Sequence, residues 1–194
     1  KAIEIAQKHK LKILPRGGGT SLAGQTVGEA LVIDFSRYMN KILEVNVKER
    51  WVKVQPGLVR DELNEEMAKH KLHFAPDPAT SSRANVGGMV GNNSSGTKSI
   101  LYGKTVDHIL EARVLLADGT ELLLKELSQA EFLQKAQQKN REGDIYRNFL
   151  EIIQQNREEI KQRFPKVMRR VGGYNLDEFV YTDRWNLAKL ITGS

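Results

Sequence analysis

Two segments rich in glycine and small polar residues contain most of the groups that could do chemistry. The first, residues 15–25, holds three adjacent glycines followed by Thr20 and Ser21. The second, residues 76–96, mixes glycine with Asn, Ser and Thr. Glycines leave consecutive backbone N–H groups open to an anion, and hydroxyls add further donors. Both compositions indicate a phosphate cradle, although a flexible loop explains the first segment alone equally well.

Neither segment matches the two common nucleotide-binding patterns. The dinucleotide pattern Gly-x-Gly-x-x-Gly requires a glycine where this sequence has Leu22. The mononucleotide P-loop requires Lys directly after Gly96, but Thr97 stands there and Lys98 comes one residue late. We therefore exclude both patterns. Two long polar segments, if ordered, instead indicate an elongated ligand with several polar groups.

Other candidate sites are weaker. Ser95 and Lys98 have the spacing of a serine–lysine nucleophile pair, but the companion motifs are absent. His70 and His73 have helical spacing without a third ligand nearby, so hydrogen-bonded or solvated roles are favoured over metal binding. The chain has no Cys, which excludes a thiolate nucleophile, a disulfide and a Cys-ligated zinc or iron–sulfur cluster within it.

The composition is that of a folded chain. Its 194 residues, 40% hydrophobic and 28% charged, suffice for one domain or two small lobes with a real core. The apolar runs fall far short of the ~20 residues that span a bilayer. Charge is interleaved with apolar residues from Lys1 to Lys12, unlike a secretory signal, so we expect a cytoplasmic protein. Because the sequence starts without Met and ends in Thr192-Gly193-Ser194, we expect a fragment.

A net charge of +6 raises the question of nucleic-acid binding. Basic residues are interleaved with acidic ones, except for a local excess at Lys161, Arg163, Lys166, Arg169 and Arg170. No zinc-finger spacing, ribonucleoprotein motif or basic heptad accompanies that excess. A solvated helix end explains it as well as a phosphate track does, and we expect no nucleic-acid partner.

Both helices and strands are expected to position the two segments. In order, the patterns predict a helix over 1–10, strands over 11–15 and 30–35, a hairpin of 42–47 with 51–55, and a helix over 58–70. Residues 74–103 contain few large apolar side chains and are expected to form a long loop, either disordered or functional.

The second half begins with a hairpin of 109–116 with 121–124, in which both Asp118 and Gly119 are expected to adopt positive φ. Ser128 and Glu131 form a capping box that opens a helical region. A buried stripe is expected along that region at Ile145, Phe149, Ile152, Ile153, Asn156, Ile160 and Phe164. The order of elements predicts an α+β or mixed α/β class.

Taken together, the two segments resemble those of the flavin-binding domain in the para-cresol methylhydroxylase and vanillyl alcohol oxidase superfamily. The resemblance extends from Ile3 to Ser194 and includes the hairpin at Ala117-Asp118-Gly119. The sequence is most similar to the FAD-linked 2-hydroxyacid dehydrogenases and oxidases. That branch includes the glycolate oxidase flavin subunit, D-lactate dehydrogenase and D-2-hydroxyglutarate dehydrogenase.

The resemblance implies that the first segment wraps the FAD pyrophosphate and that the second lines the ribose and the isoalloxazine ring. The implied residues of the first are Pro15, Arg16, Gly17, Gly18, Gly19, Thr20, Ser21, Leu22, Gly24 and Gln25. Those of the second are Pro76, Asp77, Pro78, Thr80, Ser81, Ala84, Asn85, Gly87, Gly88, Val90, Gly91, Asn93, Ser94, Ser95, Gly96, Tyr102 and Gly103. The first segment contains no His, so the resemblance implies non-covalent FAD. It assigns no catalytic residue and no metal ligand.

The implied fold is an α+β FAD-binding domain of two α/β lobes, incomplete at both termini. Residues 1–48 would form part of the N-terminal lobe, and residues 49–194 the second lobe with a helical insertion. The cap domain that completes the substrate site in the superfamily is absent from this chain. The stretch 169–179 is similar to large members that also carry an iron–sulfur segment.

The implied function is that of an FAD-binding module in a flavin-dependent oxidoreductase. It would oxidise a 2-hydroxyacid of the D-lactate, glycolate or D-2-hydroxyglutarate class to the 2-oxoacid by hydride transfer to FAD. The chain alone is expected to be inactive. The alternative is a non-redox module that binds another phosphate ligand. For Arg169 and Arg170, both a role facing the substrate carboxylate and a place on a solvated helix end remain open.

Overall fold

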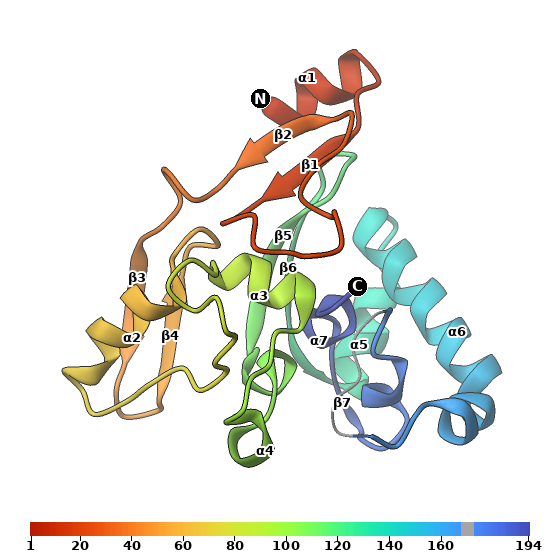
Figure 1. Cartoon of the computed structure of the whole chain (residues 1–194). Helices are drawn as coiled ribbons and strands as arrows, with labels where there is room; N and C mark the ends of the chain where they lie inside the picture. The colour runs from red at the N-terminus through yellow and green to blue at the C-terminus, as the bar shows by residue number, and fades with distance from the viewer. Residues whose placement is uncertain (168–172) are drawn as a thin grey trace. The chain divides into compact units, whose positions relative to one another are not determined.

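A computed structural model describes residues 1–167 and 173–194, which form two compact units, Lys1–Thr105 and Val106–Ser194 (Figure 1). Each unit contains helices and strands, which confirms the expected mixed class. The predicted division into lobes at residue 48 stays a prediction. Each unit has its own hydrophobic core.

The first unit begins with helix α1 (Ala2–Lys8), which buries Ala6 and has no side-chain cap at its start. Strand β1 (Ile13–Arg16) then pairs in parallel with β2 (Leu31–Asp34). Parallel neighbours require a long crossover, which is commonly a helix. Here residues 17–30 make that crossover, so the first glycine-rich segment begins directly at the end of β1.

A hairpin and a helix build the core of this unit. Strands β3 (Ile42–Asn46) and β4 (Trp51–Val54) form the expected antiparallel hairpin. Helix α2 (Arg60–Ala68) buries Leu63 and Met67 against the apolar side chains of that hairpin, together with Leu58. In the sequence, Val59, Leu63 and Met67 have the four-residue spacing of a buried helix face. The structure buries Leu63 and Met67 as this spacing predicts, whereas Val59 is the half-buried N-cap residue that precedes the helix.

The expectation of one long loop over residues 74–103 is wrong. Helix α3 (Val86–Asn92) and the short helix α4 (Ser99–Tyr102) lie within it. Three glycines in α3 each cost about 1 kcal/mol of helix propensity relative to Ala. Packing opposes this cost, because Met89 is buried and Gly87 donates its N–H to the carbonyl of Pro56 at 2.8 Å.

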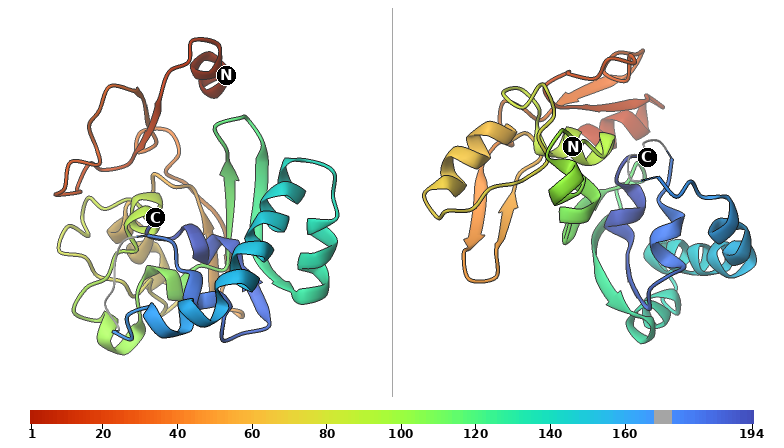
Figure 2. Two further views of the ribbon diagram at one scale, coloured as in Figure 1. Left: turned by 90° about the vertical axis from the view of Figure 1, so that its right-hand side faces the viewer. Right: turned by 60° about the horizontal axis from the view of Figure 1, so that its bottom comes forward.

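The second unit is built on a three-stranded antiparallel sheet (Figure 2). The 3-10 turn η1 (Thr105–His108) leads to β5 (Glu111–Leu115), β6 (Glu121–Ser128) and, much later, β7 (Arg184–Asn186), with β6 in the centre. Helices α5 (Gln129–Ala136) and α6 (Arg141–Arg163) pack side by side, and the capping box of Ser128 and Glu131 is confirmed at the start of α5. The 3-10 turn η2 (Leu176–Phe179) and α7 (Leu187–Ile191) complete the unit.

The turn between β5 and β6 differs from the expectation. Gly119 has φ of 84°, but Asp118 does not have positive φ. The N–H of Gly119 bonds the carbonyl of Leu116 at 2.9 Å, and the N–H of Leu116 bonds the carbonyl of Thr120 at 2.9 Å. This is a three-residue loop closed by a left-handed glycine, in which one positive φ suffices.

The stripe predicted along α6 is partly correct. Phe149, Ile153 and Ile160 are buried, whereas Ile152 and Asn156 are exposed. Tyr146, which the prediction omitted, is buried instead. The physical reason is a cluster of aromatic rings in which Phe132 contacts the rings of Tyr146, Phe149 and Trp185 at centroid distances of 4.5, 5.9 and 5.1 Å.

Candidate functional site

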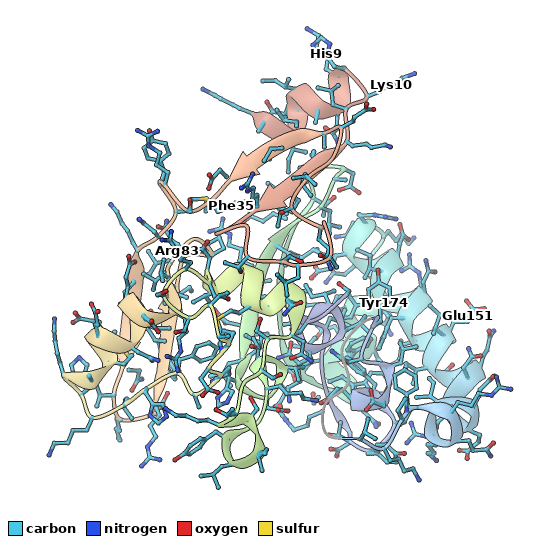
Figure 3. All side chains as sticks on the ribbon, in the orientation of Figure 1. His9, Lys10, Phe35, Arg83, Glu151 and Tyr174 are labelled. Carbon is cyan, nitrogen blue, oxygen red and sulfur yellow. The ribbon has the colours of Figure 1, made fainter. Side chains whose placement is uncertain are left out.

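The backbone of the first glycine-rich segment lies directly against the second. A β-carbon at Gly18 would stand 2.1 Å from the carbonyl oxygen of Arg83, and one at Gly17 would stand 2.8 Å from Oδ1 of Asn85. Figure 3 labels Arg83 in the loop that precedes α3. Only glycine, which has no β-carbon, permits this approach. The contact brings together two segments more than 60 residues apart in the sequence.

Asn85 lies at the centre of this contact and is 2% exposed. It is the N-cap residue of α3, yet its side chain makes no capping hydrogen bond. Its Nδ2 instead donates to the carbonyl of Gly57 at 2.5 Å. Within the described part of the chain, its Oδ1 is buried without a hydrogen-bond donor. Such an atom costs about 1–3 kcal/mol, and in a folded protein it often marks a place where a ligand or a rearrangement supplies the donor.

Other glycines of the two segments face open space. A β-carbon at Gly24, Gly88 or Gly91 would meet no heavy atom of the described residues within 4 Å. Gly88 and Gly91 are three residues apart on α3 and therefore share a face of that helix. Packing within the described residues thus explains the glycines at 17 and 18 but not those at 88 and 91, whose small size leaves room for a ligand.

The second segment is ordered by its own hydrogen bonds. The carboxylate of Asp77 accepts from the hydroxyl of Thr97 at 3.1 Å and from the N–H of Lys98 at 3.0 Å. A β-carbon at Gly96 would stand 2.0 Å from the carbonyl oxygen of Asp77. Thr105 donates its hydroxyl to the carbonyl of the buried Ser94 at 2.7 Å. The carboxylate of Asp77 therefore joins the two ends of the segment.

The remaining predicted site residues divide by exposure. Thr20 and Ser21 are half-buried, and Ser21 donates its hydroxyl to the side chain of Gln25. Leu22 is fully exposed, at 101%. Buried or half-buried positions of the second segment are Pro76, Pro78, Ser81, Ala84, Gly87, Val90, Asn93, Ser95 and Gly103. Pro15, Arg16 and Thr80 are exposed.

Tyr102, another predicted site residue, has a ring contact with His73. Its ring meets that of His73 edge-on, with centroids 5.6 Å apart. Arg169 and Arg170, the candidates for binding a carboxylate, lie outside the described residues. Of the other basic residues near them, Lys161 and Arg163 form ion pairs with Glu158 and Glu159 of the same helix, at 2.8 and 3.2 Å.

Positive charge is concentrated in the first unit. Residues 1–105 hold 16 of the 30 Lys and Arg but only 10 of the 24 Asp and Glu, which accounts for the whole net charge of +6. The guanidinium of Arg16 folds back on Gly19, whose β-carbon would stand 2.9 Å from it. Hydrogen bonds from the hydroxyl and N–H of Ser36 lower the pKa of the nearby Asp34, and the charges of Arg16 and Arg37 add to the effect.

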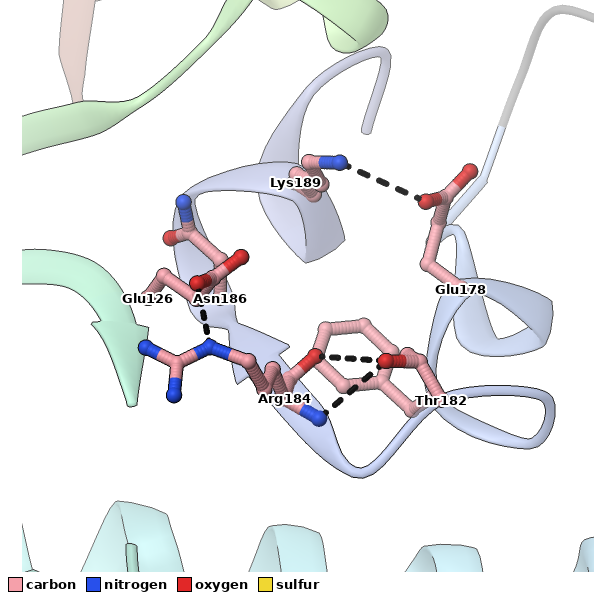
Figure 4. Close-up of a pocket in the computed structure, with 7 residues that line it drawn as sticks. Glu126, Glu178, Thr182, Arg184, Asn186 and Lys189 are labelled. Carbon is pink, nitrogen blue, oxygen red and sulfur yellow. Dashed lines mark hydrogen bonds and ion pairs between the residues drawn. The ribbon is translucent and has the colours of Figure 1, made fainter. Parts of the chain in front are cut away.

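A hollow of about 220 Å³ in the second unit is a different feature (Figure 4). Its charged lining is already paired, because Arg184 bonds Glu126 at 2.5 Å and Lys189 lies 3.8 Å from Glu178. None of the predicted site residues lines it. Its paired charges leave no convergent group for a ligand, so the contact between the two glycine-rich segments remains the candidate site.

Residues that the sequence analysis missed hold this site together. The carbonyl of Arg83 and the main chain of Pro56 and Gly57 meet the glycines or Asn85, and Arg60 and Asn64 bind the segment from α2. Arg60 and Asn64 have the four-residue spacing of one helix face and adjoin the apolar stripe of α2. No motif in the sequence marks these two residues, because the main-chain groups that they bind, in Phe74 and Pro76, lie ten or more residues away.

These features fit a ligand that carries a diphosphate. Two backbone segments with few side chains converge, and hydroxyls and a guanidinium lie on the first. Residues 1–125 match a family described as FAD binding domain. The chain therefore belongs to the family of FAD-binding domains, and FAD is the cofactor of that family.

Among known proteins, D-2-hydroxyglutarate dehydrogenase of Pseudomonas putida is 43% identical over 189 residues, covering 95% of this chain and 18% of that protein. Mitochondrial D-lactate dehydrogenase [cytochrome] of Kluyveromyces lactis is 36% identical over 124 residues, covering 62% of this chain and 21% of that protein. The chain thus spans about a fifth of the length of these relatives.

A solved structure of alkyldihydroxyacetonephosphate synthase superposes with a TM-score of 0.58 at 30% identity. It covers 63% of this chain and 25% of the other. The architecture expected from the two segments is therefore confirmed for this part of the chain.

Two further findings concern residues 1–167 and 173–194. No helix in those ranges combines the length and apolar character needed to cross a membrane. In the same ranges, no three His, Cys, Asp or Glu side chains gather so that they could hold a metal ion.

Proposed function

We propose that this chain is the FAD-binding module of an enzyme that oxidises a 2-hydroxyacid to the 2-oxoacid. When bound, FAD supplies the redox chemistry by accepting a hydride from the α-carbon, while the hydroxyl proton of the substrate leaves to a base. The close approach of Gly18 to Arg83 carries the proposal, because it joins the two segments into one site. The identity of 43% to a D-2-hydroxyglutarate dehydrogenase supports the substrate class.

In this proposal the residues of the chain bind and orient the cofactor. The backbone N–H groups of Gly17, Gly18 and Gly19 and the hydroxyls of Thr20 and Ser21 hold the diphosphate. The glycine face of α3 accepts a flat part of the cofactor. The net charge of +6 on residues 1–105 favours a dianionic ligand over a neutral one.

Phosphate contacts alone do not explain tight binding. Four or five N–H donors to a charged phosphate contribute roughly 6–15 kcal/mol, at about 1.5–3 kcal/mol each. Association costs about 4–15 kcal/mol. Affinity therefore depends on burying the aromatic rings of FAD as well, and in our proposal a cap domain outside this chain completes the pocket and binds the hydroxyacid.

Titration of the purified protein with FAD tests the first half of the proposal. Quenching of flavin fluorescence that saturates, and that ADP weakens by competition, is the expected result. A protein that binds ADP or inorganic pyrophosphate but not FAD would instead be the non-redox phosphate-binding module. The relatives do not favour that alternative.

Anaerobic addition of substrate tests the second half. D-2-hydroxyglutarate, D-lactate and glycolate are each added to the FAD-loaded full-length protein, which in our proposal includes the cap domain, and loss of the oxidised flavin absorbance is followed. One of the three is expected to bleach the flavin, with the L-enantiomer of the chiral acids as control. Bound flavin that none of them reduces would contradict the substrate class while leaving the cofactor assignment intact.

A further inference from the structure

Side chains in the first turn of α2 form hydrogen bonds with the backbone at the start of the second glycine-rich segment. The guanidinium of Arg60 donates from Nε to the carbonyl of Pro76 at 3.0 Å and from Nη2 to the carbonyl of Phe74 at 3.3 Å. Asn64 accepts from the N–H of Phe74 at 2.7 Å and donates to its carbonyl at 3.1 Å. Two side chains thus make four hydrogen bonds to the main chain of Phe74 and Pro76.

Further hydrogen bonds join α2 to the residues that follow Pro76. Asp61 accepts from the hydroxyl of Ser81 at 3.0 Å and from Nη1 of Arg60 at 3.0 Å. The backbone N–H of Arg60 bonds the carbonyl of Ala84 at 2.9 Å. Residues 74–84, which we call the strap, are therefore bound to α2 at four points along their length.

The strap connects α2 to both parts of the candidate site. At one end, Asp77 directly follows Pro76 and braces Thr97 and Lys98. At the other end, the carbonyl oxygen of Arg83 lies 2.1 Å from the position that a β-carbon on Gly18 would take. A displacement of the strap would therefore move the surface on which the first glycine-rich segment rests.

The chemistry of Arg60 indicates that this residue orients the strap rather than stabilises the fold. Its side chain is 12% exposed, and a buried charge is commonly neutral or unfavourable for stability compared with an apolar side chain of similar size. The apolar packing of α2 comes from Leu63 and Met67 on the hairpin. What the planar guanidinium adds is a fixed direction for two carbonyl groups at once.

We propose that Arg60 and Asn64 are positioning residues that hold the strap in the conformation that binds FAD. This inference rests on the proposed function, and it adds that α2, which contributes no residue to the glycine-rich segments, determines the affinity and the surroundings of the flavin. Positioning groups of this kind act by locking the residues that contact the ligand.

Arg60→Met and Asn64→Ala test the inference. Three quantities are measured for each: the dissociation constant for FAD, the visible circular dichroism of bound flavin at saturating FAD, and the thermal midpoint of the protein without FAD. We expect Arg60→Met to raise the dissociation constant about tenfold or more, as for the loss of hydrogen bonds that involve a charged group. Asn64→Ala removes neutral hydrogen bonds and is expected to raise it by about three- to tenfold. We also expect an altered flavin spectrum at saturation, which a loss of stability alone would not produce.

Two controls separate positioning from folding. Glu65→Gln changes an exposed residue of the same helix and is expected to leave all three quantities unchanged. Arg157→Met removes another arginine bonded to a carbonyl, that of Val180 at 2.6 Å in the second unit. It is expected to lower the thermal midpoint without changing the flavin spectrum.

Arg60→Lys covers the case in which Arg60→Met fails to fold. Lysine keeps the charge but cannot direct two carbonyls in one plane, so a folded Arg60→Lys protein with weakened FAD binding would support the inference. Variants that bind FAD with unchanged affinity and spectrum, whatever their stability, would overturn it. Failure of the unchanged protein to bind FAD would instead contradict the proposed function.

Discussion

Gly18 lies so close to Arg83 that a β-carbon at position 18 would stand 2.1 Å from the carbonyl oxygen of Arg83. The contact joins the crossover that follows β1 to the loop that precedes α3. The atom that a β-carbon would meet belongs to the backbone and not to a flexible side chain. A larger residue at 18 therefore has to move one of the two segments. The glycine is thus required by the protein itself, before any ligand is considered.

Gly18→Ala is therefore expected to weaken FAD binding and to destabilise the first unit together. Both effects have one cause, because the β-carbon of alanine would clash with the carbonyl oxygen of Arg83. We expect a loss of about 1–3 kcal/mol in stability and at least tenfold in FAD affinity. Gly28→Ala is the control, since its β-carbon would meet no heavy atom of residues 1–167 and 173–194 within 4 Å. Equal stability of both variants would contradict the contact.

Phe132→Ala is expected to cost about 3–5 kcal/mol of unfolding free energy. The ring of Phe132 is 1% exposed and meets three other aromatic rings in the core of the second unit. Chemical denaturation measures the loss. Leu133→Ala, at the next position of α5 and 50% exposed, is expected to change stability by less than about 1 kcal/mol. Similar losses for the two would show that the core is packed differently.

Tyr146 makes stability fall at high pH. Burial raises the pKa of its hydroxyl to about 12, and the charge of Glu142 adds to the rise. An unfolded tyrosine ionises near pH ~10, so the folded protein holds this proton more tightly than the unfolded chain. The stabilisation that the protonated hydroxyl of Tyr146 gives to the folded state is complete below pH ~10. It is lost as pH rises towards ~12, which lowers the free energy of unfolding by about 2–3 kcal/mol at most.

Urea unfolding of the protein and of Tyr146→Phe across this alkaline range checks the prediction. The stability of Tyr146→Phe is expected to fall less steeply, since it lacks the titrating hydroxyl, while lysines titrate alike in both proteins. Parallel decline of the two curves would contradict a buried hydroxyl at 146.

Local patterns predicted much of the secondary structure. The hairpin of β3 and β4, the buried face of α2 and the capping box at Ser128 each depend on residues within one or two turns of each other. Such signals are complete within a short window of sequence. The two glycine-rich segments were recognised in the same way, from composition alone.

What could not be predicted depends on residues distant in sequence. Helix α3 forms in spite of three glycines because Met89 is buried and Gly87 packs on Pro56. Ile152 is exposed although it fits the stripe, because the aromatic cluster decides which face of α6 turns inward. Arg60 has no motif, and its role follows only from the carbonyls of Phe74 and Pro76 that lie beside it.

The most direct test of the central claim is at Gly88, on the open glycine face of α3. A β-carbon there would meet no heavy atom of the described residues within 4 Å, and replacing glycine with alanine in a helix gains about 1 kcal/mol. Gly88→Ala and Gly88→Leu should therefore keep or raise the thermal midpoint of the protein without FAD. If FAD packs on this face, its dissociation constant should rise with the size of the side chain, by about tenfold or more for leucine. Unchanged FAD affinity in a fully stable Gly88→Leu protein would contradict the claim that the two segments form one flavin site.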